Sequence, residues 1–157
     1  MLIEGRTDLK ALRRFLHLYG KDHKIALLPL DGARMINGGS GDQLEEIKRI
    51  ADTVVAIIDS ERATAGAPLS PDRQAFVELC AAAGIKCHVL QRRALENYFP
   101  EQAIKAGIGE NFHALGLYDS FGDTQPGWSK ADNWRAAHHV TKEELDATDL
   151  GPFLQSL

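Results

Sequence analysis

Segment 53–61, which reads TVVAIIDSE, constrains the possible fold of this chain more than any other stretch. Its first six residues are apolar or β-branched, and two carboxylates follow, at Asp59 and Glu61. A continuous apolar run bounded by polar residues predicts a strand buried on both faces, as in a parallel sheet. If the backbone stays extended, side chains two residues apart point the same way. The two carboxylates would then converge and would need a cation between them.

The rest of the chain alternates predicted strands with predicted helices. Strands are expected at 2–3, 24–30, 53–58 and 85–90, and helices at 8–19, 42–51 and 71–83. Such alternation is typical of a parallel α/β sheet with right-handed crossovers. After an irregular stretch at 107–128, further helices are expected at 130–138 and from 141 onward. We therefore predict a single α/β domain over residues 1–157, with about four parallel strands and additional C-terminal helices.

Residues with short polar side chains mark where these helices should begin. Thr7 is expected to cap the first helix, and Ser70, followed by proline, should cap the third. Thr141 and Glu144 match the spacing of a capping box. In the helix at 42–51, three apolar residues repeat at helical spacing and predict one inward face: Leu44, Ile47 and Ile50.

Acidic residues follow three of the predicted strands. They are Glu4 and Asp8, then Asp59 and Glu61, then Glu96. The carboxyl ends of parallel strands lie at one edge of a sheet, and ligands of open α/β sheets bind there. Each group has a plainer interpretation as well, since Asp8 also suits the first turn of a helix. Three separate placements of acids at one edge nevertheless predict a common site.

Carboxylate oxygens are the ligands that Mg²⁺ prefers, and four or five of them are enough for one or two ions. Two ions about 3.5–4 Å apart stabilise both the attacking and the leaving oxygen of a phosphoryl displacement. Arg92 and Arg93 are candidate contacts for a substrate phosphate, and Lys130 is a candidate catalytic residue that would steady the charge of the transition state. There is no zinc-ligand set, no serine-hydrolase motif and no Walker lysine, so the pattern favours phosphodiester cleavage.

Net charge and the pattern of apolar residues indicate how such a protein would attract its substrate and in which compartment it would act. The formal net charge is −4, so a nucleic-acid substrate must be attracted by local Lys and Arg and by a bound cation. No apolar run is long enough to span a membrane and there is no signal-peptide pattern, which predicts a cytoplasmic protein without a membrane partner. Cys80 and Cys87 lack metal-ligand company and are expected to be small buried side chains.

The motifs resemble those of Toprim (topoisomerase–primase) domains. Residues 2–8, reading LIEGRTD, are similar to the first Toprim strand-end motif, and 57–61, reading IIDSE, to the second, which is usually Asp-x-Asp. Three further features resemble the OLD (overcoming lysogenization defect) family nucleases: the acid at Asp8, the stretch RRALENY at 92–98, and a late lysine, Lys130. The resemblance spans most of the chain except 107–128, and Glu61 departs from the usual aspartate.

This resemblance implies a Rossmann-like Toprim fold and a Mg²⁺- or Mn²⁺-dependent DNA endonuclease or nickase that uses two ions. Ca²⁺ would occupy such a site without supporting cleavage. The implied catalytic residues are Glu4, Asp59 and Lys130, with Lys130 as base or charge stabiliser and Ser60 contributing its hydroxyl or backbone. The implied metal ligands are Glu4, Asp8, Asp59, Glu61 and Glu96.

The resemblance also implies partners. We expect the chain to be part of a longer protein in which an ATPase domain acts in cis, or to meet such a domain in trans. A homodimer formed through that domain is expected, and DNA is the expected substrate, with RNA left open.

Two other interpretations remain open at the level of sequence. A Toprim-like scaffold would bind DNA or a partner without cutting it, which the glutamate at position 61 and the acidic net charge allow. A receiver-like domain would accept a phosphoryl group at Asp59 with help from Lys130, although such domains place adjacent acids after the first strand.

Overall fold

A computed structural model describes residues 1–30, 41–125 and 127–157, and for 41–43 it describes the backbone alone. Segment 31–41, whose glycines predict a loop, lies outside the described residues except for its last position. Within the described ranges, no helix combines the length and the apolar character needed to cross a membrane.

The described residues contain a four-stranded sheet in which every neighbouring pair is parallel, as predicted. The strands are β1 (Leu2–Ile3), β2 (Leu28–Pro29), β3 (Val55–Ile58) and β4 (Lys86–Val89). Their order is β2-β1-β3-β4, so β1 and β3 are central. The strand predicted at 24–30 is reduced to two residues, and Pro29, which has no N–H, pairs with Ile3 at the edge of the sheet.

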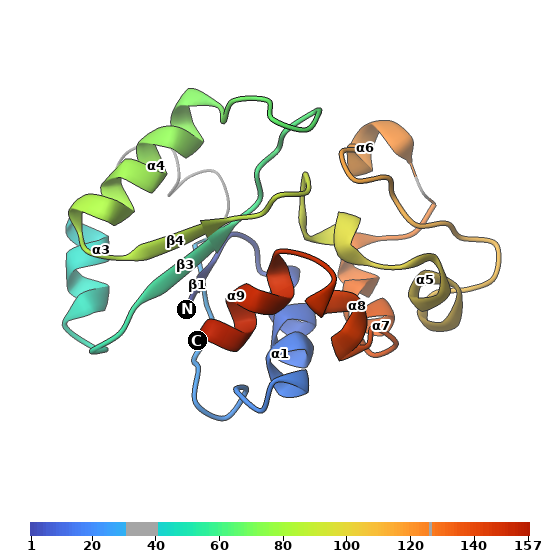
Figure 1. The fold of residues 1–157 in the computed structure, drawn as a ribbon, viewed down its shortest axis with the longest axis horizontal. Coiled ribbons are helices and arrows are strands. Elements are labelled where there is room, and N and C mark those ends of the chain that lie inside the picture. Colours follow the sequence, from blue (N-terminus) through green and yellow to red (C-terminus); the bar gives the residue numbers. More distant parts are fainter. Residues whose placement is uncertain (31–40, 126) are drawn as a thin grey trace.

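Helices surround this sheet and continue beyond it (Figure 1). The longer ones are α1 (Asp8–Leu18), α3 (Gly41–Lys48) and α4 (Pro71–Ala82). The C-terminal part consists of η1 (Leu95–Tyr98), α5 (Glu101–Gly107), α6 (Phe121–Thr124), η2 (Lys130–Asp132), α7 (Asn133–Ala137), α8 (Lys142–Asp146) and α9 (Leu150–Ser156). The helices predicted from 130 onward are therefore present but broken into short pieces.

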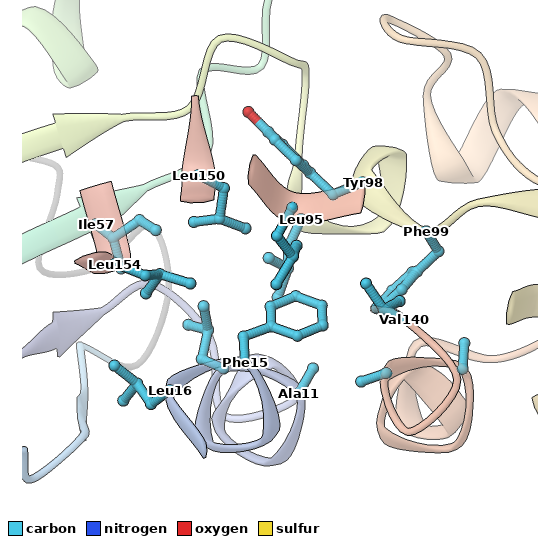
Figure 2. Close-up of a cluster of buried hydrophobic side chains, with 14 of the residues drawn as sticks. Ala11, Phe15, Leu16, Ile57, Leu95, Tyr98, Phe99, Val140, Leu150 and Leu154 are labelled. Atoms are coloured by element: carbon cyan, nitrogen blue, oxygen red, sulfur yellow. The ribbon is translucent and has the colours of Figure 1, made fainter. Parts of the chain in front are cut away.

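The central strands are buried on both faces, as the apolar run predicts. Ile3 and Ile57 point into a core formed with α1, α9 and other C-terminal helices. Leu2 and Ile58 point the opposite way, into a second core formed with α3 and α4. This division follows from the alternation of side chains along a strand. Figure 2 shows the first core, where Phe15 of α1 faces Leu95 and Tyr98 of η1 together with α9 side chains.

The predicted caps are only partly correct. The Ser70 hydroxyl accepts a hydrogen bond from the Arg73 N–H at 3.5 Å, and Thr141 and Glu144 form the predicted capping box. Thr7 does not cap α1 through its side chain, because its hydroxyl donates to Asp8 instead. Ile50 is also misassigned, because α3 ends at Lys48 and the Ile50 side chain is 79% exposed.

The cysteine prediction holds for one of the two residues. Cys80 of α4 is fully buried in the second core, whereas Cys87 of β4 is only partly buried. Both thiols are free of disulfides. They are therefore packing residues in the layer between α4 and the sheet.

Candidate functional site

The central strands β1 and β3 are neighbours, and the connections that follow them run toward opposite edges of the sheet. The chain passes from β1 through α1 to β2 on one side, and from β3 through α4 to β4 on the other. Glu4 directly follows β1 and Asp59 directly follows β3. The carboxyl ends of two such neighbouring strands form the crevice where open α/β sheets bind ligands. Figure 1 shows that α5, α6 and α7 lie beyond this end of the strands, whereas α9 lies alongside the sheet.

Glu4 and Asp59 are in direct contact across this crevice. The backbone N–H of Asp59 donates to Oε2 of Glu4 at 3.0 Å. Arg73, in the first turn of α4, donates to Oε1 and Oε2 of Glu4, both at 2.9 Å. Arg73 also donates to the backbone oxygen of Asp59 at 2.7 Å. An arginine that is 9% exposed therefore joins the ends of the two central strands.

Asp8 lies at the start of α1 and folds back over the turn that precedes it. Its Oδ2 accepts a hydrogen bond from the backbone N–H of Gly5 at 3.2 Å, and its Oδ1 accepts from the Thr7 hydroxyl at 3.3 Å. A Cβ at position 5 would lie 2.9 Å from Oδ2 of Asp8. A side chain at position 5 would therefore push the Asp8 carboxylate out of its place.

Glu96 reaches the same region from η1. Its side chain is 1% exposed, and its Oε1 accepts from Nδ2 of Asn133 at 2.9 Å and pairs with Nζ of Lys130 at 3.2 Å. Its other oxygen, Oε2, is buried and has no hydrogen-bond partner among the residues that the structure describes. A buried carboxylate oxygen without a partner is costly, so this atom indicates a place for a ligand.

Four of the predicted acids, Glu4, Asp8, Asp59 and Glu96, are close enough for their charges to interact. Burial raises the pKa of Asp59 well above its usual range, and the negative charges of Glu4, Asp8 and Glu96 raise it further. Burial and then the charge of Glu96 raise the pKa of Asp8 to about 6. Negative charge is therefore only partly neutralised around Asp8 and Asp59.

Lys130 is a cation close enough to Glu96, Asp59 and Asp8 to interact with their charges. Burial lowers the pKa of Lys130, but the charge of Glu96, the hydrogen bond to Glu96 and the charges of Asp59 and Asp8 outweigh it and raise the pKa overall. Lys130 is therefore an ammonium at neutral pH. An ammonium has no lone pair to accept a proton, so Lys130 suits the stabilisation of negative charge rather than the role of a base.

Glu61 does not meet Asp59 in the way an extended backbone would require. Its φ is 53°, in the left-handed region, so the strand has already ended. The Glu61 carboxylate pairs with Nη2 of Arg93 at 3.0 Å and lies 4.0 Å from Nη2 of Arg73. The predicted convergence of the Asp59 and Glu61 carboxylates required an extended backbone. The backbone at Glu61 is not extended, so this requirement is not met.

The two predicted phosphate contacts are both engaged within the protein. Arg92 donates to the backbone oxygen of Asn97 at 2.7 Å and lies over the ring of Tyr98, with the guanidinium carbon 4.8 Å from its centre. Arg93 is paired with Glu61. The Ser60 hydroxyl donates to the backbone oxygen of Arg92 at 2.8 Å, so it holds a loop in place.

The donor set suits a hard cation, although the ligands are not yet arranged around one. Among residues 1–30, 41–125 and 127–157, no three His, Cys, Asp or Glu side chains form a group that would hold a metal ion as they stand. The observation that favours a fit is the unpartnered Oε2 of Glu96 beside the raised pKa values of Asp8 and Asp59. Asp8, Asp59 and Glu96 are the residues that would hold Mg²⁺ or Mn²⁺.

Sequence reasoning missed two residues of this site, Arg73 and Asn133. Arg73 lies three positions after the cap residue Ser70, at the start of the helix that follows β3. The helix that follows a strand begins near the carboxyl end of the sheet, so its first turn was a place to search for a cation. Asn133 carries no such signal, because its contact with Glu96 depends on how η2 and α7 pack.

Comparison with known proteins adds no identification: no protein-family profile, no curated protein and no solved structure matches this chain.

Proposed function

We propose that this protein is a divalent-metal-dependent phosphodiesterase that cuts or nicks DNA, with a Toprim-like domain of the OLD nuclease kind. The observation that carries the proposal is the gathering of Glu4, Asp8, Asp59 and Glu96 at the ends of β1 and β3, with Oε2 of Glu96 buried and unpartnered. The proposed cofactor is Mg²⁺ or Mn²⁺, held by oxygen ligands. An ATPase domain, in cis or in trans, is the proposed partner.

Each residue has a distinct part in this proposal. Asp8, Asp59 and Glu96 would hold the cation, which would supply Lewis-acid chemistry when bound. The Lys130 ammonium, 3.2 Å from Oε1 of Glu96 and 40% exposed, is accessible to a substrate phosphate and stabilises charge that develops on it. Glu4 holds the backbone N–H of Asp59 and so positions that carboxylate.

Cleavage of supercoiled plasmid DNA in Mg²⁺ and in Mn²⁺ tests this proposal. We expect Asp59→Asn and Glu96→Gln each to slow nicking by about 100-fold or more, because each removes charge where the cation binds. Asp72→Asn is the matched control, since Asp72 is exposed in the first turn of α4. Equal cleavage rates for the parent and Asp59→Asn would show that the nuclease assignment is wrong.

A scaffold that binds DNA or a partner without cutting is the second candidate. The observation that favours it is the pairing of Glu4 with Arg73, Glu61 with Arg93 and Glu96 with Lys130, which neutralises much of the acidic set without a metal. A scaffold would shift DNA in gels equally well with EDTA and with Mg²⁺, and would leave the DNA intact. Dependence of binding on the metal would count against it.

The receiver-like interpretation has less support. Lys130 pairs with Glu96 rather than with Asp59, and Oδ1 of Asp59 already accepts the N–H of Leu95 at 3.1 Å. The raised pKa of Asp59 also lowers the fraction of its carboxyl that is ionised and able to attack a phosphoryl group. Incubation with a small phosphoryl donor tests it, and a stable acylphosphate at Asp59, found by mass spectrometry, would favour it over the nuclease.

A further inference from the structure

Arg73 is the most completely engaged cation of the candidate site. Its guanidinium donates to both oxygens of Glu4 at 2.9 Å and to the backbone oxygen of Asp59 at 2.7 Å. A third acid, Glu61, has an oxygen 4.0 Å away. The Arg73 side chain is 11% exposed, so these contacts are made largely out of water. Charge-assisted, bidentate pairs of this kind are among the stronger polar contacts in proteins.

The contacts of Arg73 remove Glu4 from the set of free metal ligands. Each oxygen of Glu4 accepts one N–H of Arg73, and Oε2 also accepts the backbone N–H of Asp59. A divalent ion bound to Glu4 would have to lie close to the positively charged guanidinium. On this side of the crevice the arginine itself supplies the positive charge that a metal would bring.

The other side of the crevice is different. Within the described part of the chain, Asp8 accepts hydrogen bonds from Gly5 and Thr7 of its own turn, and Glu96 has one buried oxygen without a partner. Asp59 lies between the two sides, with its backbone bound by Arg73 and its Oδ1 bound by the N–H of Leu95. Three carboxylates therefore remain for a cation here, which suffices for a single ion that keeps some of its waters.

We propose that the Arg73 guanidinium takes the place of a second divalent ion, so that this site binds one metal ion rather than two. This inference rests on the proposed function, because it concerns the same site. It departs from the two-ion expectation that the sequence motifs imply. In this arrangement Arg73 is a positioning residue: it fixes Glu4 and the backbone of Asp59, and the single ion lies toward Asp8 and Glu96.

Calorimetric titration with Mn²⁺, without DNA, tests the inference. We expect the parent to bind one ion and Arg73→Gln to bind two, because the substitution removes the positive charge and frees both oxygens of Glu4. Arg73→Lys keeps the charge and should still bind one ion. Arg49→Gln is the matched control, since Arg49 is 76% exposed and pairs with Glu46 away from the site. Any other pair of values for the parent and Arg73→Gln would overturn the proposal.

A second measurement decides the question if Arg73→Gln does not fold. Anomalous scattering from parent crystals soaked in Mn²⁺ should show one ion on Asp8, Asp59 and Glu96, with Arg73 still bound to Glu4. An ion bonded to Glu4 would overturn the proposal. Failure of the proposed function is a different result: a parent that binds one Mn²⁺ and cuts no DNA leaves the assignment of Arg73 intact.

Discussion

At the scale of single residues, the site is organised by how the charge of each carboxylate is compensated. Glu4 has Arg73, Glu61 has Arg93, and Glu96 has Lys130 and Asn133. Among the residues that the structure describes, Asp8 and Asp59 form no ion pair, and burial followed by neighbouring negative charge raises their pKa values. Removing a compensating group should therefore cost more than removing an exposed charge, because it leaves a carboxylate buried and unpaired.

Lys130 offers a direct test of this compensation. We expect Lys130→Met to lower the free energy of unfolding by about 1–2 kcal/mol, less than for a fully buried pair, because water reaches the lysine. Urea unfolding measures the loss. In a Glu96→Gln background the same substitution should cost much less, because no carboxylate is left unpaired. An equal cost in both backgrounds would contradict the pairing of Lys130 with Glu96.

Asp8 predicts how stability depends on pH when no metal is present. Its pKa rises from 3.8 to about 6 on folding, so the native state favours the protonated form. Its contribution to stability is full below the unfolded value and is lost as the pH rises through about 6. Between about pH 4 and pH 7 in EDTA, we expect the parent to lose on the order of 3 kcal/mol relative to Asp8→Asn. Identical pH profiles would contradict this.

At the scale of elements, close helix packing places the groups that surround Glu96. Gly107 at the end of α5 lies against the backbone of α7, where a Cβ would come within 2.6 Å of the carbonyl group of Arg135. Asn133 begins α7, and η2, which carries Lys130, directly precedes it. The approach of α5 to α7 therefore sets where both partners of Glu96 lie.

Substitution of Gly107 tests this packing. We expect Gly107→Ala to lower the free energy of unfolding by about 1–3 kcal/mol, because the added methyl group overlaps backbone atoms that have little room to move. Thermal unfolding followed by circular dichroism measures the change. Gly122→Ala in α6 is the control, because its nearest atom would be Oγ of Ser120 at 3.8 Å, and it should be neutral or slightly stabilising. Equal effects would argue against close α5–α7 packing.

At the scale of the whole molecule, a bound cation would link parts of the chain that are far apart in sequence. Asp8 belongs to the start of α1, Asp59 follows β3, and Glu96 belongs to η1. A ligand that binds only the folded state stabilises it by mass action. Metal binding should therefore be visible as stability of the entire domain, separately from any cleavage.

We expect Mg²⁺ or Mn²⁺ to raise the thermal midpoint of the parent at neutral pH. The free energy of unfolding should increase by about 2.7 kcal/mol at an ion concentration 100-fold above the dissociation constant of the ion. Differential scanning fluorimetry with and without EDTA measures the shift. Asp59→Asn should lose most of it, since it removes a central ligand. A shift of the same size in both proteins would place the ion elsewhere.

The sequence by itself was sufficient to predict the parallel α/β architecture and the edge at which the acids gather. Local patterns carry this information, because an apolar run such as 53–58 specifies a doubly buried strand and the carboxyl ends of parallel strands share one edge. Only the tertiary structure decided which charges pair: Arg73 with Glu4, Lys130 and Asn133 with Glu96, and Glu61 with Arg93. These pairs join residues far apart in the chain, and their geometry depends on how helices pack, which no local periodicity encodes.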